Sequence, residues 1–258
     1  MNISLEGKVA LITGSSRGIG AELVEGFAKH GANVIINYVK SEKLAHDLAK
    51  EMVNKYNVDC IAVKADVTKE EDVERLLSVV REEFDRVDIL VNNALHSYRF
   101  DPDQRKLAWE IDWEDYQRQL DGSLKASFLT CKYSVPLMKE NSFGRIINMI
   151  SNLVQRPVVP YHDYTTAKGA LLSFSQNLAV DLGPFGITVN CVAPGIVYPT
   201  EASKLTKEEV KNSIIEQTPL GRIAKPNDIV GSVLFFGSKW SQFITGQNII
   251  VDGGFTMK

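Results

Sequence analysis

The sequence lacks the features of a membrane, secreted or metal-stabilised protein. No apolar run approaches the roughly 20 residues that a transmembrane helix needs, and residues 1–8 lack the apolar core of a signal peptide. There are only three cysteines, Cys60, Cys131 and Cys191, far apart and each in an apolar setting. Such spacing is typical of buried free thiols in a reducing compartment rather than of disulfides or a zinc site. We expect a cytoplasmic protein with no metal site and no membrane partner.

The sequence also has no excess of positive charge. Lys and Arg number 29 against 32 Asp and Glu, a net charge of -3, whereas a nucleic-acid-binding surface needs a basic excess or a basic stripe. No nucleic-acid partner is therefore expected. The chain is 44% hydrophobic and has no repeat, low-complexity segment or linker, which is typical of a globular protein. We predict a single domain over residues 1–258.

Short apolar runs alternate with longer amphipathic stretches along the chain. Seven runs are continuously apolar and rich in β-branched residues, as strands buried on both faces of a parallel sheet are; they cover residues 8–12, 33–37, 60–63, 87–91, 145–150, 187–192 and 248–251. Stretches of helical period lie between them, at residues 21–30, 42–56, 69–84 and 165–182. This alternation predicts an α/β fold: one doubly wound Rossmann-type domain with a seven-stranded parallel sheet and helices on both faces.

A glycine-rich turn follows the first predicted strand. Gly14, Gly18 and Gly20 have the spacing G-x-x-x-G-x-G before a predicted helix. Such glycines allow a tight turn and let the backbone approach a pyrophosphate, and the helix N-terminus offers free N–H groups to phosphates. A plain tight turn would show the same glycines. Ligands bind such sheets beyond the carboxyl ends of the strands, where small polar residues recur: Asp66-Val67, Asn92-Asn93-Ala94, Ser151 and Pro194-Gly195.

Tyr164 and Lys168 stand four residues apart in a predicted helix and therefore share one face. A free tyrosine has a pKa of about 10 and needs help to exchange a proton near neutrality. A neighbouring ammonium favours the phenolate, which suits proton transfer coupled to hydride transfer at a ketone or secondary alcohol. His162 and Asp163 could suggest a hydrolase dyad, but no nucleophile motif accompanies them, and Asp163 is expected to cap the helix.

These motifs carry a resemblance to a known family. They are Thr13-Gly-x-x-x-Gly-x-Gly20, Asp66, Asn92-Asn-Ala94, Ser151, Tyr164-x-x-x-Lys168, Pro194-Gly195 and Gly246-Gln-x-x-x-Val-Asp-Gly-Gly254. Over residues 5–255 the chain resembles the short-chain dehydrogenase/reductases, and in overall character the bacterial 3-oxoacyl-acyl-carrier-protein reductases. The resemblance implies an oxidoreductase in which Tyr164 donates the proton, Lys168 holds the nicotinamide ribose and Ser151 binds the substrate oxygen.

The second predicted strand ends without the acidic residue that would bind the ribose 2′-hydroxyl of NAD and repel a 2′-phosphate. Arg17, Lys40 and Ser41 could bind that phosphate, although both cations could equally be ordinary solvated charges. The resemblance implies NADP(H) as preferred cofactor, with NAD(H) possible. The residues that it assigns to the cofactor are Gly14, Ser15, Ser16, Arg17, Gly18, Ile19, Gly20, Asn37, Tyr38, Lys40, Ser41, Asp66, Val67, Asn93, Ala94, Tyr164, Lys168, Pro194, Gly195, Val197 and Thr200. Asp66, implied to contact adenine, could also be only a helix cap.

The sequence departs from the family pattern at three positions. Ser123 stands where the family has an asparagine whose backbone carbonyl anchors a water bonded to the catalytic lysine, so we expect this relay with altered geometry. Leu95 replaces the glycine that usually follows the Asn-Asn-Ala turn, and an insertion at residues 96–113 comes after it. The threonine implied to contact the carboxamide is displaced by one residue, to Thr200.

The substrate is expected to meet residues that follow the strands and open the insertion, namely His96, Tyr98, Asn152, Leu153 and Tyr161. Residues 206–215 are compatible with a helix that forms a mobile lid. The resemblance implies a small-molecule ketone or a 3-oxoacyl group on an acyl carrier protein, as in fatty acid synthesis. Arg99, Arg118 and Lys125 could meet such an acidic carrier, or they could be solvated charges.

Two other functions stay open. The chain could be a dehydrogenase or reductase of a sugar, polyol or other small secondary alcohol. It could also be a weakly active NADP-binding sensor or scaffold, which the departures favour and the retention of Ser151, Tyr164 and Lys168 opposes. Helices equivalent to 165–182 pack between subunits in the family, which implies a homotetramer; a helix buried within one chain would carry the same apolar residues.

Overall fold

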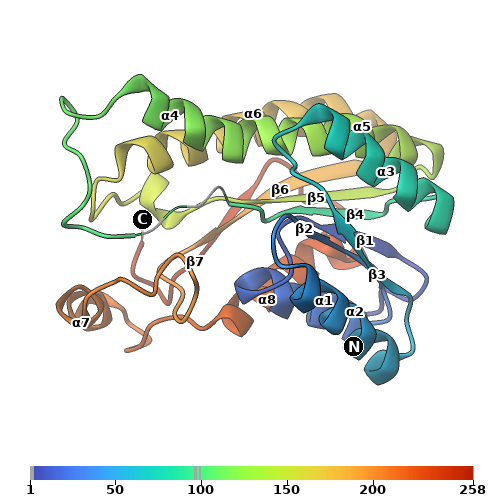
Figure 1. Cartoon of the computed structure of the whole chain (residues 1–258), viewed down its shortest axis with the longest axis horizontal. Coiled ribbons are helices and arrows are strands. Elements are labelled where there is room, and N and C mark those ends of the chain that lie inside the picture. The colour runs from blue at the N-terminus through green and yellow to red at the C-terminus, as the bar shows by residue number, and fades with distance from the viewer. Residues whose placement is uncertain (1–2, 96–97, 99, 258) are drawn as a thin grey trace.

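The computed structural model describes residues 3–95, 98 and 100–257. Its centre is a seven-stranded sheet in the order β3-β2-β1-β4-β5-β6-β7, with every neighbouring pair parallel (Figure 1). The strands are β1 (Val9–Ile12), β2 (Asn33–Tyr38), β3 (Cys60–Lys64), β4 (Ile89–Asn92), β5 (Gly144–Met149), β6 (Ile187–Pro194) and β7 (Asn248–Val251). The strand order turns back between β1 and β4, which is where ligands bind in such sheets.

Helices cover both faces of the sheet (Figure 1). One layer is formed by α1 (Gly18–Lys29), α2 (Glu42–Tyr56) and α8 (Pro226–Gly237), and the other by α3 (Glu70–Phe84), α4 (Trp113–Leu120), α5 (Ala126–Glu140) and α6 (His162–Leu182). The helix α7 (Glu208–Gln217) lies apart from both layers. Shorter helical turns are η1 (Asp121–Lys125), η2 (Asn152–Val154), η3 (Gly183–Phe185) and η4 (Lys239–Ser241). No helix in the described part of the chain is long and apolar enough to cross a membrane.

The core lies between the sheet and each helical layer. The strand residues Leu11 and Ile12 are fully buried on opposite faces, as continuously apolar strands predict. Phe27 of α1 lies in the cluster on one face and Leu76 of α3 in the cluster on the other. The predicted doubly wound α/β fold is therefore confirmed, and its packing fixes the strand ends on which the site is built.

Two helices differ from what the pattern predicts. The helix expected at residues 165–182 begins at His162, and its N-cap is Tyr161. The prediction that Asp163 caps this helix is therefore wrong: its carboxylate lies in the first turn and accepts a hydrogen bond from the Tyr98 hydroxyl at 3.1 Å. The second helix, α4 to α5, contains the π-helical turn η1, which interrupts the helical period and hides it from a periodicity search.

Candidate active site

A cavity of about 350 Å³ opens beyond the carboxyl ends of the strands. Residues from widely separated segments line it, among them Ile19 of the glycine turn, Ser151 after β5, the α6 residues Tyr164 and Lys168, and Pro194 at the end of β6. The structure thus brings together the three residues that the sequence singles out for proton transfer. It places them at the edge of the sheet predicted to hold the site.

Tyr164 and Lys168 face this cavity from one side of α6. Both are almost fully buried, at 6% and 4% exposure, and the Lys168 Nζ lies 5.8 Å from the centre of the Tyr164 ring. Burial raises the pKa of Tyr164 to about 12, although a hydrogen bond with the Ser151 side chain opposes that rise. Burial lowers the pKa of Lys168 to about 8. The phenol therefore keeps its proton at neutral pH, and a neighbouring positive charge has to lower its pKa before Tyr164 can donate that proton readily.

Ser151 and Lys168 are held by bonds to the backbone. The Ser151 Oγ accepts a hydrogen bond from the Leu153 N–H at 3.2 Å, which caps η2. The Lys168 Nζ donates to the Met149 carbonyl at 2.8 Å. The backbone around the end of β5 therefore fixes the direction of both side chains.

Ser123 lies inside the π-helical turn η1, which packs against α6. Its side chain is buried, and its Oγ has no hydrogen-bond partner among the described residues. A buried hydroxyl without a partner is costly and is often explained by an ordered water. The position that departs from the family's asparagine therefore retains a free polar atom next to the helix of the candidate acid.

The glycine turn is shaped by close approach of its own backbone. Gly14 and Gly18 have positive φ angles of 60° and 58°, which favour glycine. A Cβ on Gly20 would lie 2.6 Å from the Ser15 Cα, so no larger residue fits without movement. The N-cap of α1, Arg17, makes no side-chain cap bond, which leaves the first N–H groups of α1 free. This arrangement can hold a phosphate.

Three side chains assigned to the cofactor point into the protein instead. The Ser15 Oγ donates to the Ile12 carbonyl. The Asn37 amide accepts from the Gly14 N–H at 3.1 Å and donates to the Ala65 carbonyl. Tyr38 packs in the core. Their side chains hold the turn and the end of β2 in place, so any contact of theirs with a cofactor would come from the backbone.

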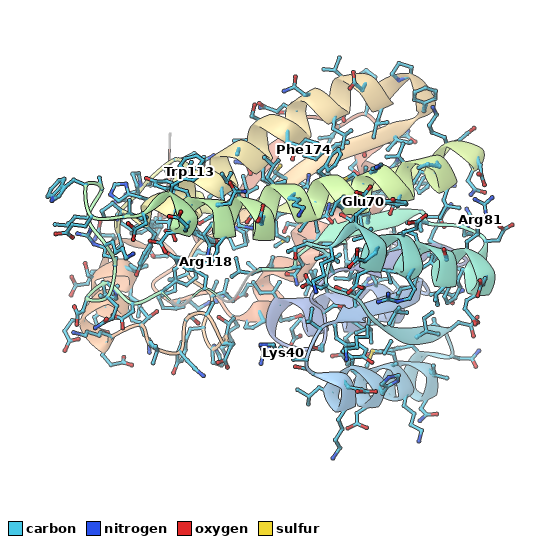
Figure 2. All side chains as sticks on the ribbon, turned by 45° about the horizontal axis from the view of Figure 1, so that its top comes forward. Lys40, Glu70, Arg81, Trp113, Arg118 and Phe174 are labelled. Atoms are coloured by element: carbon cyan, nitrogen blue, oxygen red, sulfur yellow. The ribbon has the colours of Figure 1, made fainter. Side chains whose placement is uncertain are left out.

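Two cationic residues are assigned to the cofactor, Arg17 and Lys40. Arg17 and Lys40 are exposed and form no ion pair with any described residue, and Lys40 lies between β2 and α2 (Figure 2). Ser41 is the N-cap of α2, and its hydroxyl makes no cap bond. The Asp66 carboxylate accepts hydrogen bonds from the Thr68 N–H and hydroxyl in the turn before α3, whose N-cap is Lys69. Asp66 is therefore not the cap of α3, and its contact with adenine stays a prediction.

Hydrogen bonds join the Asn-Asn-Ala turn to Thr13 and Gly14. The Thr13 hydroxyl accepts from the backbone N–H groups of Asn93 and Ala94, at 3.0 and 2.9 Å. The Asn93 amide donates to the Thr13 and Gly14 carbonyls, while Asn93 and Leu95 both line the cavity. The turn therefore links β4 to the glycine turn.

The residues predicted to meet substrate divide into three groups. Asn152, Leu153 and Tyr161 line the cavity, and Asn152 also donates to the Asp252 carboxylate at 3.0 Å. Tyr98 does not line it; its ring stacks on Tyr164. His96 lies outside the described residues, as does Arg99. Val197 and Thr200, the last two residues assigned to the cofactor, both line the cavity.

Phe255, near the C-terminus, lines the cavity and is not identified from the sequence. Its available signal is its place directly after the Gly-Gly pair. Val210 and Ile214 line the cavity from α7, which overlaps the predicted lid segment 206–215. Phe100 lines it from the insertion, next to the residues expected to meet substrate.

Comparison with known proteins identifies the family. A family model described as enoyl-(acyl carrier protein) reductase matches residues 14–256. The 3-oxoacyl-[acyl-carrier-protein] reductase FabG of Aquifex aeolicus is 36% identical over 98% of this chain and 99% of its own. Glucose 1-dehydrogenase 2 of Bacillus subtilis is 32% identical over 98% and 96% of the two chains. A crystal structure of L-sorbose reductase from Gluconobacter frateurii, complexed with NADPH and L-sorbose, aligns with a TM-score of 0.91 at 30% identity over the full length of both chains.

The chain belongs to the short-chain dehydrogenase/reductase family. It is an oxidoreductase by family, of the class that acts on CH–OH and C=O groups. Its relatives include proteins named for a 3-oxoacyl-[acyl-carrier-protein], for glucose and for L-sorbose. These names do not fix the substrate of this chain.

Proposed function

We propose that this chain is an NADPH-dependent reductase that transfers hydride to the ketone of a 3-oxoacyl thioester. The observation that carries the proposal is the position of Ser151 and Tyr164 on the wall of a largely apolar cavity. A relative named as a 3-oxoacyl-acyl-carrier-protein reductase supports this substrate class. We infer a role in fatty acid synthesis from the same substrate chemistry.

The residues around the glycine turn fit NADP(H). The free N–H groups at the start of α1 suit the pyrophosphate, and the unpaired Arg17 and Lys40 suit a 2′-phosphate beside the Ser41 hydroxyl. A structural neighbour is complexed with NADPH. When bound, the cofactor supplies the hydride that reduces the ketone carbon. NAD(H) remains the second choice, because the end of β2 has no acid to hold a free 2′-hydroxyl.

In the proposed reaction the chain's own residues handle the oxygen and its proton. Ser151 donates a hydrogen bond to the ketone oxygen, and Tyr164 gives that oxygen its proton as hydride reaches the carbon. Lys168 lies close enough to Tyr164 to stabilise the resulting phenolate. We propose that Lys168 leaves the Met149 carbonyl to reach a ribose hydroxyl, and that the Ser123 backbone completes the proton route through water.

The remainder of the cavity favours an acyl chain over a sugar. The lining beyond the polar wall is mainly apolar: Phe100, Leu153, Val158, Val159, Val210, Ile214, Leu220 and Phe255. Two of its charged side chains, Arg222 and Asp228, bond to each other at 2.6 Å. A site for a polyol needs polar partners for each hydroxyl, because an unpaired buried hydroxyl is penalised. Reduction or oxidation of a sugar is the second candidate, because relatives are named for glucose and L-sorbose.

We infer that the carrier is an acyl carrier protein and that the enzyme is a homotetramer. Arg118, one of the cations expected to meet the carrier, pairs with Asp115 on α4 (Figure 2), while Lys125 is exposed. Phe128 on α5 and Val180 on α6 are 46% and 77% exposed in the same helical layer, which suits contact between subunits. Light scattering after gel filtration measures the mass of the oligomer. The carrier's contribution to KM is measured by comparing KM for the substrate bound to acyl carrier protein with KM for the same substrate bound to coenzyme A.

The test of function is NADPH oxidation with an acetoacetyl thioester, a sugar ketone and a simple ketone as substrates. We expect kcat/KM for the thioester to exceed that for the sugar by about a hundredfold or more. Tyr164→Phe should lower kcat by about a thousandfold while NADPH affinity stays nearly unchanged, because only the proton donor is lost. Turnover of the sugar alone would support the second candidate, and NADPH binding without any turnover would indicate a sensor or scaffold. Full activity in Tyr164→Phe would refute its role as acid.

A further inference from the structure

Four aromatic rings pack together around the proposed acid. The ring of Tyr98 stacks on that of Tyr164, with centroids 5.0 Å apart and an interplanar angle of 25°. Phe100 meets Tyr164 edge-on, with ring centroids 5.1 Å apart. The rings of Tyr98 and Phe100 each also contact the ring of Tyr161. Stacked and edge-to-face pairs at these distances are favourable geometries. The insertion after β4 therefore supplies two of the four rings, and the other two belong to Tyr161, the N-cap of α6, and to Tyr164 in its first turn.

This aromatic cluster separates two cavities. The first is the apolar cavity that contains Tyr164. The second, of about 320 Å³, is lined mostly by polar and charged side chains: Tyr98, Asp101, Gln104, Arg105, Lys106, Ile111, Asp115, Tyr161, His162, Asp163 and Leu205. Phe100 and Tyr164 line only the first cavity, Tyr98 only the second, and Tyr161 lines both. The ring of Tyr98 therefore has the polar cavity on one side and Tyr164 on the other.

Two bonds fix this part of the insertion in place. The Tyr98 hydroxyl donates to the Asp163 carboxylate at 3.1 Å, one residue before Tyr164 in the helix. The Phe100 N–H donates to the Ala202 carbonyl at 3.0 Å, in the segment that leads to α7. One bond anchors the Tyr98 ring to α6, and the other anchors the neighbouring backbone to the segment before α7. The Tyr98 ring therefore has little freedom to leave Tyr164.

We propose that Tyr98, anchored by Asp163, is a positioning residue that walls Tyr164 off from the polar cavity. The inference rests on the proposed role of Tyr164 as acid, and it assigns a function to the insertion that distinguishes this chain from its family pattern. Without the Tyr98 ring the two cavities would meet at Tyr164. Water from the polar side would then reach the phenol and hydrate its charged form.

The consequence is a shift in the pH range of the reaction. Among the described residues, Lys168 lies near Tyr164 on the same helix, and Tyr98 of the insertion stacks on it with Asp163 bonded to the Tyr98 hydroxyl. Tyr161 lines the same cavity, and Ser151 adds a hydrogen bond. Burial keeps the pKa of Tyr164 high, so removing part of that burial lowers it. Reduction needs the protonated phenol and is lost as pH rises through this pKa, whereas oxidation of the alcohol needs the phenolate and appears above it. Opening the wall should move both profiles to lower pH.

The experiment measures kcat against pH in both directions, for the full-length protein with NADPH and ketone or with NADP⁺ and the product alcohol. We expect Tyr98→Ala to shift both midpoints down by about one pH unit. Tyr98→Phe keeps the ring and should stay within about 0.3 unit of the wild type. The matched control is Tyr116→Ala, which removes a ring stacked on Trp113 at 5.9 Å in the neighbouring α4 and should shift neither midpoint.

Wild-type midpoints in Tyr98→Ala would overturn the proposal, as would a shift equal to that of Tyr116→Ala. A lower kcat without a shift would mean that Tyr98 is merely structural, which also overturns it. Should Tyr98→Ala fail to fold, Tyr98→Leu decides, because it opens a smaller gap and should shift both midpoints in the same direction. Failure of the proposed function is distinct, since the wild-type chain would then reduce no ketone at all.

Discussion

Around β1 and β2 the buried polar side chains bond mainly to the backbone, whereas beyond β5 the side chains face the cavity. Ser15 and Asn37 hold the glycine turn through the carbonyls and N–H groups of neighbouring segments. In contrast, Phe100 and Phe255 face the substrate cavity directly. The half proposed to bind the cofactor thus presents mostly backbone and helix termini, and the half proposed to bind the substrate presents mostly side chains.

This difference explains which half tolerates change. A backbone surface depends on the conformation of a few glycines, so a single added atom disturbs it. A surface made of side chains can change its shape and polarity residue by residue while the strands beneath stay the same. Two relatives, named as a 3-oxoacyl-[acyl-carrier-protein] reductase and as a glucose 1-dehydrogenase, differ in the substrate that each name gives.

Of the three changes that test this comparison between the halves, the largest effect is expected from one methyl group in the glycine turn. Gly20→Ala places a Cβ 2.6 Å from the Ser15 Cα and 2.7 Å from the Gly14 carbonyl oxygen, so the turn must move. We expect NADPH affinity to fall by about thirtyfold, or about 2 kcal/mol, as measured by fluorescence titration. Gly231→Ala is the control, because a Cβ there, also in a helix, meets nothing within 4 Å. Equal affinities in the two variants would break the distinction between the halves.

A medium effect is expected where side chains do enter the cofactor half. Arg17→Gln and Lys40→Gln each remove one unpaired cation from the proposed 2′-phosphate site. We expect each to lower the ratio of NADPH to NADH affinity by about tenfold, or about 1.4 kcal/mol, with NADH affinity unchanged. Lys43→Gln removes the same charge from an exposed position on α2 and should leave the ratio alone. A drop in the affinity for both cofactors would instead point to damage of the turn.

The smallest effect is expected from an ion pair over the substrate half. Lys207, before α7, pairs with Asp103 of the insertion, and both side chains are more than half exposed. Exposed pairs contribute little, so Lys207→Gln should change the free energy of unfolding by less than about 0.5 kcal/mol and KM by less than about twofold. Denaturant unfolding and steady-state kinetics measure these. A large rise in KM would show that the ion pair, rather than apolar contacts, holds α7 over the cavity.

The fold was predictable because its strands are continuously apolar, and the five inner strands are almost entirely buried. Continuous apolar runs identify every strand of the sheet, with ends that differ by at most two residues. The helix α4 to α5 was not identified from its period, because the π-helical turn at Asp121–Lys125 adds a residue to one turn and puts the two parts out of phase. Periodicity finds an element only where the geometry is regular.

The site was predictable to the extent that spacing encodes it. Tyr164 and Lys168 are four residues apart, so a helix places them on one face whatever surrounds them. The position of Tyr98 depends instead on an insertion whose path no local pattern fixes, and it was expected to meet substrate. The inward turn of Asn37 likewise follows from the carbonyl and N–H that it meets in three dimensions. Contacts between distant segments are set by the packing of the whole chain.

One feature of α6 limits how this enzyme can diverge. Its N-cap is Tyr161 and its first two turns carry Asp163, Tyr164 and Lys168. The proposed acid, the neighbouring cation, the anchor of Tyr98 and a residue that lines both cavities therefore belong to one rigid element. A tilt of that element would displace all of them together, and none could be adjusted alone. New substrates are therefore more easily reached by altering the loops that face α6 than by altering the helix itself.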